Sequence, residues 1–209
     1  MNARDEILGR VRGALAAAPD AEVEVPRRYA RTADGVDVVR LFAERVGDYR
    51  ATVRIVAPEA LAPVVAAELR DAAVGTLAVP PDLPHEWLIE TGVEVRADSP
   101  VLSVNELDGC DGVLTGCAVA IAETGTIVLD GGPTQGRRAL TLVPDVHICV
   151  VPASVVVGTV PEAITRLDGT RPLTWVSGPS ATSDIELNRI EGVHGPRRLV
   201  VIVVDRQTG

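Results

Sequence analysis

The stretch that decides the fold is ATVRIVAPEALAPVVAAELRDAAVGTLAVP, residues 51–80. Residues 51–57 and 76–80 are short apolar runs that predict strands, and residues 58–73 between them predict a helix. Pro58 stands near the start of that helix, where proline is tolerated. A strand, a helix and a strand with short connections are typical of a mainly parallel sheet covered by helices, so this stretch predicts an α/β fold.

The same alternation continues on both sides of this stretch. The pattern predicts helices at 37–46, 85–92, 160–169 and 183–192, and strands at 92–97, 146–157, 172–178 and 197–205. Two extended apolar runs within 111–132 are separated by Glu123-Thr124-Gly125, which favours a tight turn between paired strands. The main body is therefore one α/β domain, residues 34–209. Residues 1–33 form an arm, with an amphipathic helix at 3–17 followed by a polar, proline-containing linker.

The composition limits both the core and the partners. Apolar residues make up 46% of the chain but aromatic residues only 2%, so Val, Leu, Ile and Ala must build the core, which suits buried parallel strands. The net charge of −9 repels phosphate backbones, which argues against nucleic acid as a partner. No apolar run has the length of a membrane span, and the N-terminus lacks a signal peptide's apolar segment, so we expect a soluble, cytoplasmic protein.

Several kinds of chemistry are excluded by the residues that are missing. All 20 basic residues are Arg, so the chain has no Schiff-base lysine, no pyridoxal-phosphate anchor and no P-loop lysine. The cysteines Cys110, Cys117 and Cys149 form no CxxC pair, and the three histidines are far apart. Neither pattern fits a zinc or iron–sulfur site, so we expect no metal and no bound cofactor.

The segment WVSGPSATSDIE, residues 175–186, carries the strongest polar signal. If a strand, a Gly-Pro loop and a helix N-terminus follow one another here, the free backbone N–H groups and the hydroxyls favour a small anion. The candidate binding residues are Gly178, Pro179, Ser180, Thr182, Ser183 and Asp184. The alternative is purely structural, because Ser183 and Glu186 have the spacing of a capping box. The local pattern does not decide between the two.

Three further candidates lie elsewhere in the chain. Glu123 is either a partly buried carboxylate acting as base or nucleophile, or the exposed tip of a hairpin. His194, in a turn before Pro196, is a candidate catalytic residue or a surface histidine. Arg137 and Arg138 follow a glycine-rich segment and form either a mobile anion-binding loop with an Arg clamp or a solvated loop.

Together these motifs resemble the LUD-domain family. The motifs AETGTIVL (122–129), LVPDVHICVVPASVVV (142–157), SGPSATSDIE (177–186) and GVHGPRRLVVIVV (192–204) occur in this order and at similar spacing in that family. The resemblance implies a three-layer α/β/α sandwich, as in the glucosamine-6-phosphate deaminase, ribose-5-phosphate isomerase and CoA-transferase superfamily. It also adds Thr124, Gly125 and Thr126 of the Glu123 turn to the candidate ligand-binding residues.

The resemblance implies a process as well. This would be the oxidation of L-lactate to pyruvate, with iron–sulfur proteins of the same system as partners and a small carboxylate or phosphate-bearing ligand. The family has an Arg after Gly-Pro-Ser, whereas this chain has Ala181, so Arg137, Arg138 or Arg197 must supply the charge if the anion site is kept. Two alternatives stay open: a stand-alone CoA-transferase-like or isomerase-like enzyme using Glu123, and a scaffold in which the hydroxyl loop is only a cap.

Overall fold

The computed structural model describes residues 3–16, 27, 31–183, 189–191 and 194–206. The chain divides into two compact units, Met1–Ala30 and Arg31–Gly209. In the first unit, α1 (Ala3–Leu15) is the helix that the sequence predicts, and none of its residues is buried. The second unit begins with a residue that already contacts its body, since the Arg31 carbonyl accepts a 2.8 Å hydrogen bond from the Thr159 hydroxyl.

Six strands form the central sheet of the second unit, in the order β1-β12-β7-β4-β2-β3. Every neighbouring pair is parallel, which confirms the predicted parallel sheet. The strands are β1 (Thr52–Val56), β2 (Thr76–Val79), β3 (Glu94–Ala97), β4 (Gly112–Thr115), β7 (Val146–Pro152) and β12 (Arg198–Val204). Because all six run the same way, their carboxyl ends share one edge, which is where open α/β sheets bind ligands.

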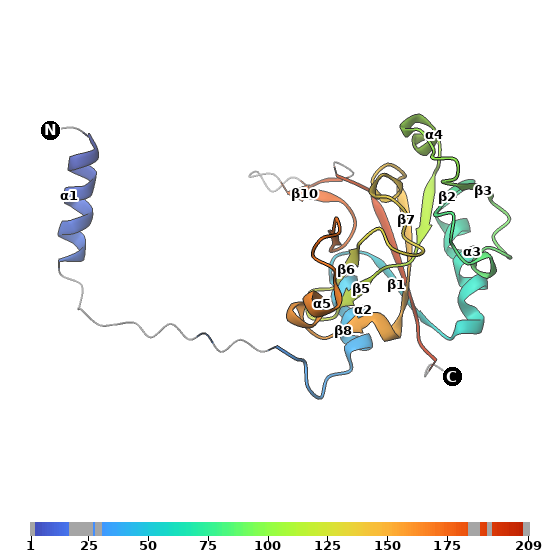
Figure 1. Cartoon of the computed structure of the whole chain (residues 1–209), viewed down its shortest axis with the longest axis horizontal. Helices are drawn as coiled ribbons and strands as arrows, with labels where there is room; N and C mark the ends of the chain where they lie inside the picture. Colours follow the sequence, from blue (N-terminus) through green and yellow to red (C-terminus); the bar gives the residue numbers. More distant parts are fainter. Residues whose placement is uncertain (1–2, 17–26, 28–30, 184–188, 192–193, 207–209) are drawn as a thin grey trace. The chain divides into compact units, whose positions relative to one another are not determined.

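The neighbouring strands β7 and β12 bury side chains on both faces of the sheet. In β12, Val200 and Ile202 pack on the face covered by α3 (Leu61–Asp71), and Val201 and Val203 pack on the opposite face. Figure 1 shows α3 on one side of the sheet and α2 (Val38–Asp48) on the other. Burial on both faces explains why the strand is a nearly unbroken apolar run.

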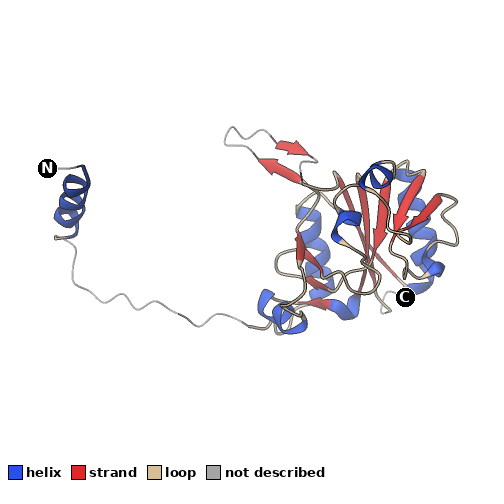
Figure 2. Cartoon of the chain, turned by 45° about the horizontal axis from the view of Figure 1, so that its top comes forward, coloured by secondary structure: helices blue, strands red, loops and turns tan. Residues whose placement is uncertain are grey.

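A second, four-stranded sheet shares the α2 face. Its order is β8-β5-β6-β9, with β5 (Val119–Ile121), β6 (Thr126–Leu129), β8 (Val156–Val157) and β9 (Thr174–Val176). Alternate residues of β5 and β6 face the central core or α5 (Val160–Arg166) on the outer side. Helices therefore lie on both faces of the central sheet, as expected for a three-layer sandwich, and one outer layer also contains this small sheet (Figure 2).

Short elements complete the second unit. They are η1 (Pro58–Ala60), η2 (His85–Trp87), α4 (Val104–Asp108), η3 (Arg138–Thr141) and η4 (Ala153–Val155). The helix expected at 85–92 is only the 3-10 turn η2, which has no side-chain cap, whereas the short helices α4 and α5 each begin with a capping box. No helix within the described ranges is long and apolar enough to cross a membrane.

The prediction of a helix over residues 183–192 is wrong. Residues Ala181–Ser183 (β10) and Arg189–Glu191 (β11) pair as antiparallel strands, and residues 184–188 and 192–193, including the predicted Asp184, lie outside the described part. The ends of this segment are tied together, since the Ser180 amide donates to the Pro196 carbonyl. A ten-residue helix would span about 15 Å and carry those ends apart, so the tertiary contacts override the capping-box pattern.

Candidate functional site

The predicted site residues of the β5–β6 turn form a polar group at one end of the small sheet. Glu123 is exposed, and its Oε1 accepts a 2.8 Å hydrogen bond from the Val160 amide at the start of α5. Gly125 makes the turn with φ of +58°, and a Cβ there would lie 2.7 Å from the carbonyl carbon of Arg45. Of the two alternatives for Glu123, the structure therefore has the exposed hairpin tip and not a partly buried carboxylate.

Three hydroxyls line up beside this turn. The Thr126 hydroxyl lies 2.7 Å from that of Thr124 and 2.8 Å from that of Ser177. Thr126 is only 4% exposed, so its hydroxyl is satisfied by protein partners and links β6 to the end of β9. Gly178 follows, packed so closely on Tyr49 that a Cβ would lie 2.5 Å from the tyrosine Cβ. This arrangement holds the hairpin in place.

Ser180 and His194 meet at a second place. The Ser180 hydroxyl accepts a 3.0 Å hydrogen bond from the His194 amide, and the Ser180 amide donates to the Pro196 carbonyl at 2.8 Å. The structure therefore brings the GPS and GVHGP motifs together through one backbone–backbone hydrogen bond and one to the Ser180 hydroxyl. The His194 residue is exposed. The side chains of Thr182 and Ser183 lie outside the described part, so their predicted ligand contacts stay predictions.

A cavity of about 910 Å³ lies where the chain leaves strands β2, β3 and β6. Acidic residues follow each strand: Asp82 after β2, Asp98 after β3 and Asp130 after β6. Three arginines also line it: Arg137, Arg138 and Arg171. Of the residues predicted from the sequence to bind a ligand, Arg137 and Arg138 line this cavity.

Arg137 is already paired inside the cavity wall. Its Nε donates to the Asp98 carboxylate at 2.7 Å, and a terminal nitrogen donates to the same carboxylate at 3.1 Å and also to the Leu102 carbonyl. Burial by itself raises the pKa of Asp98, but hydrogen bonds from Arg137 and the Leu102 amide outweigh it, so this pKa lies below its ordinary value. The pair is ionised at neutral pH and ties the residue before η3 to the segment that follows β3.

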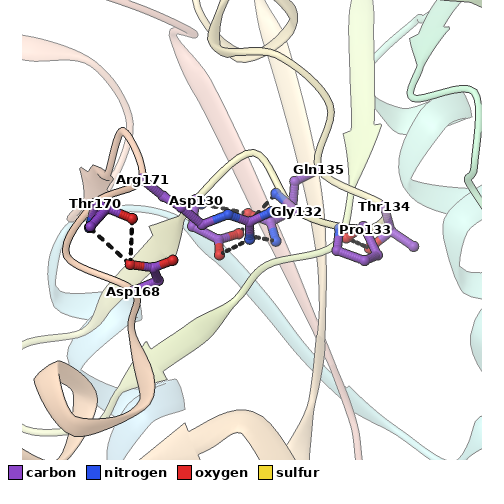
Figure 3. Close-up of polar contacts among 8 residues, drawn as sticks. All are labelled: Asp130, Gly132, Pro133, Thr134, Gln135, Asp168, Thr170 and Arg171. Atoms are coloured by element: carbon purple, nitrogen blue, oxygen red, sulfur yellow. Dashed lines mark hydrogen bonds and ion pairs between the residues drawn. The ribbon is translucent and has the colours of Figure 1, made fainter.

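Asp130 organises the opposite wall, as Figure 3 shows. Its carboxylate accepts hydrogen bonds from the Gly132 amide and the Gln135 side chain, each at 2.9 Å, and from Arg171. The Gln135 side chain accepts in return from the Asp130 amide at 2.7 Å. Burial alone raises the pKa of Asp130, but these hydrogen bonds from Gly132, Arg171 and Gln135 lower it below its ordinary value. Asp130 therefore stays ionised, and its negative charge balances the positive charge of Arg171.

The loop between these two pairs is fixed along its length. The Thr134 amide donates to the Asp82 carboxylate at 2.9 Å, and the Thr134 carbonyl accepts from the Gly116 amide at 2.8 Å. Thr134 has a φ of +64°, which is unusual for a residue with a side chain and is held by these two bonds. The glycine-rich segment 131–138, expected as a mobile or solvated loop, is thus a hydrogen-bonded frame around the cavity.

Arg138 differs from the other candidate arginines. Arg197 forms a bidentate pair with Asp145, at 2.6 Å for Nε and again through a terminal nitrogen, and Arg137 and Arg171 are paired as above. The side chain of Arg138 is exposed, lines the cavity and has no hydrogen-bonding or ionic partner among the described residues. Of the three arginines considered as a replacement for the charge missing at Ala181, Arg138 is the one left available.

Among the described residues, the Glu123 turn and Arg137 do not belong to one site. The Glu123 turn precedes β6, whereas Asp130 and the cavity follow it, so the two groups lie at opposite ends of this four-residue strand, roughly 13 Å apart at 3.3 Å per residue. Sequence reasoning missed Asp82, Asp98, Asp130, Gln135 and Arg171. A usable signal was present for the three Asp residues, because each follows a predicted strand near its carboxyl end.

Two titratable side chains of the core, His147 and Cys117, do not line the cavity and are uncharged at pH 7. His147 in β7 lies 2.8 Å from the Thr115 hydroxyl through Nε2, and burial lowers its pKa to about 4, so it is neutral at pH 7. The Cys117 thiol hydrogen-bonds Cys149, and this bond together with burial holds its pKa well above the ordinary value. Within the described residues no group of three or more His, Cys, Asp or Glu could hold a metal ion.

The fold and the cavity define a class: an α/β protein with a parallel sheet and a charged cavity where the chain leaves its strands. The LUD domain model matches residues 39–204, and the chain belongs to the LUD-domain family. A relative named lactate utilization protein C, from Deinococcus radiodurans, is 51% identical over 172 residues, which is 80% of each chain. Another of the same name, from Geobacillus kaustophilus, is 34% identical over 133 residues, covering 58% of this chain and 55% of the relative.

A solved structure supports the same assignment. The crystal structure of a DUF162 family protein from Deinococcus radiodurans matches with a TM-score of 0.69 and 42% sequence identity. The match covers 85% of this chain and 100% of that one. The family resemblance expected from the four sequence motifs is therefore confirmed.

Proposed function

We propose that this chain is a component of an L-lactate utilisation system and that it binds a small carboxylate or another anion in the cavity. Two observations support this. Relatives of this chain carry the name lactate utilization protein C, one of them at 51% identity. The cavity offers Arg138, an arginine with no partner among the described residues, where a carboxylate or phosphate can bind.

The state of Arg138 is the observation that carries the ligand part of the proposal. Arg137 and Arg171 keep their Asp partners, so an incoming anion would compete with a carboxylate already in place. An anion can bind Arg138 without displacing a carboxylate that is already in place. A hydrogen bond to a charged group contributes about 1.5–3 kcal/mol, and an arginine can offer two to one carboxylate or phosphate. Arg138 is thus the residue whose loss should weaken anion binding most.

In this proposal, electron transfer belongs to iron–sulfur partner proteins. The full sequence has three cysteines without a cluster-type spacing, which is consistent with such a division of labour. The alternative function, an enzyme that uses Glu123, gains no support. Glu123 is exposed, and its carboxylate accepts a hydrogen bond from the first residue of α5. We therefore assign the chain the role of ligand binding within the system and not that of electron carrier.

A complementation experiment tests the proposal. In the native host, deletion of this chain should abolish growth on L-lactate as sole carbon source, and the wild-type chain should restore it. Arg138→Gln should fail to restore growth because the anion loses its cation. Arg40→Gln is the matched control, since Arg40 is an exposed arginine of α2 far along the chain from the cavity, and it should restore growth fully.

Normal growth of the deletion strain on L-lactate would refute the role in lactate utilisation. Full rescue by Arg138→Gln would refute only the cavity as the relevant site. The partner part is tested by affinity purification from lactate-grown cells, followed by assay of iron and acid-labile sulfide. Recovery of the chain without iron–sulfur protein would count against the proposed partners.

A further inference from the structure

The cavity is much larger than lactate. Its volume is about 910 Å³. Lactate has six non-hydrogen atoms and would fill roughly a tenth of this space, whereas cavities of about 300–1,000 Å³ are typical for drug- and cofactor-sized ligands. A six-atom anion held by one exposed arginine would leave most of the wall in contact with water. The size therefore points to a larger molecule that carries the anion as one of its parts.

The wall offers a second polar group that suits hydroxyl donors. One oxygen of Asp82 accepts the Thr134 amide at 2.9 Å, and its other oxygen has no partner among the described residues. Asp98 and Asp130 are both engaged by arginine. Asp82 is thus the acidic residue of the cavity that remains able to accept further hydrogen bonds. A carboxylate near the carboxyl end of a parallel strand is well placed to accept hydrogen bonds from a ribose diol.

Part of the remaining wall is apolar. Val101 lines the cavity and is 70% exposed, which is high for a valine. Pro81, Pro133 and Pro172 add three rings whose backbone conformation is restricted. A flat apolar group lying on this wall would cover Val101 and gain the free energy of burying apolar surface. Arg138, Asp82 and this apolar wall therefore offer contacts for an anion, a diol and a flat ring.

We propose that the ligand of this cavity is a nucleotide with a free ribose diol: its phosphate binds Arg138, its 2′- and 3′-hydroxyls donate to Asp82, and its base lies on the Val101 wall. This inference rests on the proposed anion site at Arg138 and specifies its ligand. Mononucleotides and dinucleotide cofactors share this chemistry. Coenzyme A does not, because its ribose 3′-hydroxyl is phosphorylated, so Asp82 would repel it.

Calorimetric titration of the purified full chain tests the ligand class, with ADP, NAD⁺, coenzyme A, inorganic phosphate and L-lactate as separate probes. ADP or NAD⁺ should bind at least tenfold more tightly than phosphate, L-lactate or coenzyme A. Arg138→Gln should weaken ADP binding by about 10- to 150-fold, the equivalent of one lost charge-assisted contact. Arg138→Lys should recover part of this affinity because it keeps the charge, and Arg40→Gln should change nothing.

The diol contact has its own test. Wild-type protein should prefer ADP to 2′,3′-dideoxy-ADP, and Asp82→Asn should remove that preference. The asparagine can still accept the Thr134 amide, so the loop keeps its anchor. The inference is overturned if neither ADP nor NAD⁺ binds, if Arg138→Gln binds ADP as well as wild type, or if the dideoxy analogue binds equally to wild type.

The two proposals fail separately. If no nucleotide binds while L-lactate or pyruvate does and Arg138→Gln abolishes growth on lactate, the nucleotide inference is wrong and the proposed function stands. If ADP binds through Arg138 while the deletion strain grows normally on lactate, the cavity assignment stands and the lactate role is wrong.

Discussion

Polar and charged residues lie at both ends of β6, but their hydrogen-bonding surroundings differ. At the start of the strand, Glu123 accepts a hydrogen bond from the Val160 amide, and the Thr126 hydroxyl is hydrogen-bonded to those of Thr124 and Ser177 around a turn. At its end, Asp130 accepts hydrogen bonds from three donors. The loop that follows encloses a cavity in which Arg138 has no partner among the described residues. Polar residues close a turn at one end and shape a binding site at the other. The difference lies in what surrounds them, since the cavity end faces segments from three strands.

A fall in pH should have the largest effect on stability, through the buried His147 of the central sheet. The pKa of His147 is lowered from 6.5 to about 4, so the folded state resists its protonation and loses stability as pH falls from 6.5 towards 4. Between pH 7 and pH 4.5 this loss should amount to about 2.5 kcal/mol. Urea unfolding at a series of pH values measures it.

The control for this pH dependence is the His147→Gln variant, which keeps a polar group near Thr115 but does not titrate. Its stability should be lower at pH 7 and nearly flat down to pH 4.5. Asp98 and Asp130 have lowered pKa values, so their contribution is lost only below about pH 4 and does not interfere in this window. An equal slope in wild type and variant would exclude His147 as the cause.

Asp130→Ala should have the next largest effect. The change removes the acceptor for the Gly132 amide, Gln135 and Arg171, and the penalty is moderated because the Arg171 side chain is 43% exposed. We expect a loss of roughly 2 kcal/mol in the free energy of unfolding and weaker anion binding. Chemical denaturation and calorimetry provide the two readouts. Unchanged anion affinity would mean that the conformation of the 131–138 loop does not depend on the hydrogen bonds of Asp130.

Glu123→Ala tests the other end of the strand and should have the smallest effect. It removes one hydrogen bond at the start of α5, which is worth about 0.5–1 kcal/mol for an exposed cap. Ligand binding and growth on L-lactate should not change, because the cavity lies at the far end of β6. A loss of growth on L-lactate without a loss of stability would instead support the alternative function, an enzyme that uses Glu123.

The parallel core could be read from the sequence, while parts of the site could not. The strands β7 and β12 are long apolar runs that no exposed segment would carry, so their burial in the sheet follows from composition. The capping-box pattern at Ser183 failed as a helix signal because a cap contributes only about 1 kcal/mol. The hydrogen bonds joining Ser180 to His194 and Pro196 outweighed it.

The sequence by itself determined the α/β class, the sheet of parallel strands and the membership of a family. Each depends on local periodicity or on ordered motifs, which neighbouring residues along the chain set. Only the tertiary structure decided which arginine is available, because Arg137, Arg138, Arg171 and Arg197 are alike in sequence. Three of them meet an Asp from a distant segment, at separations of 39, 41 and 52 residues, and Arg138 does not. Pairing over such distances depends on how the strands are ordered in space, and no local pattern records that order.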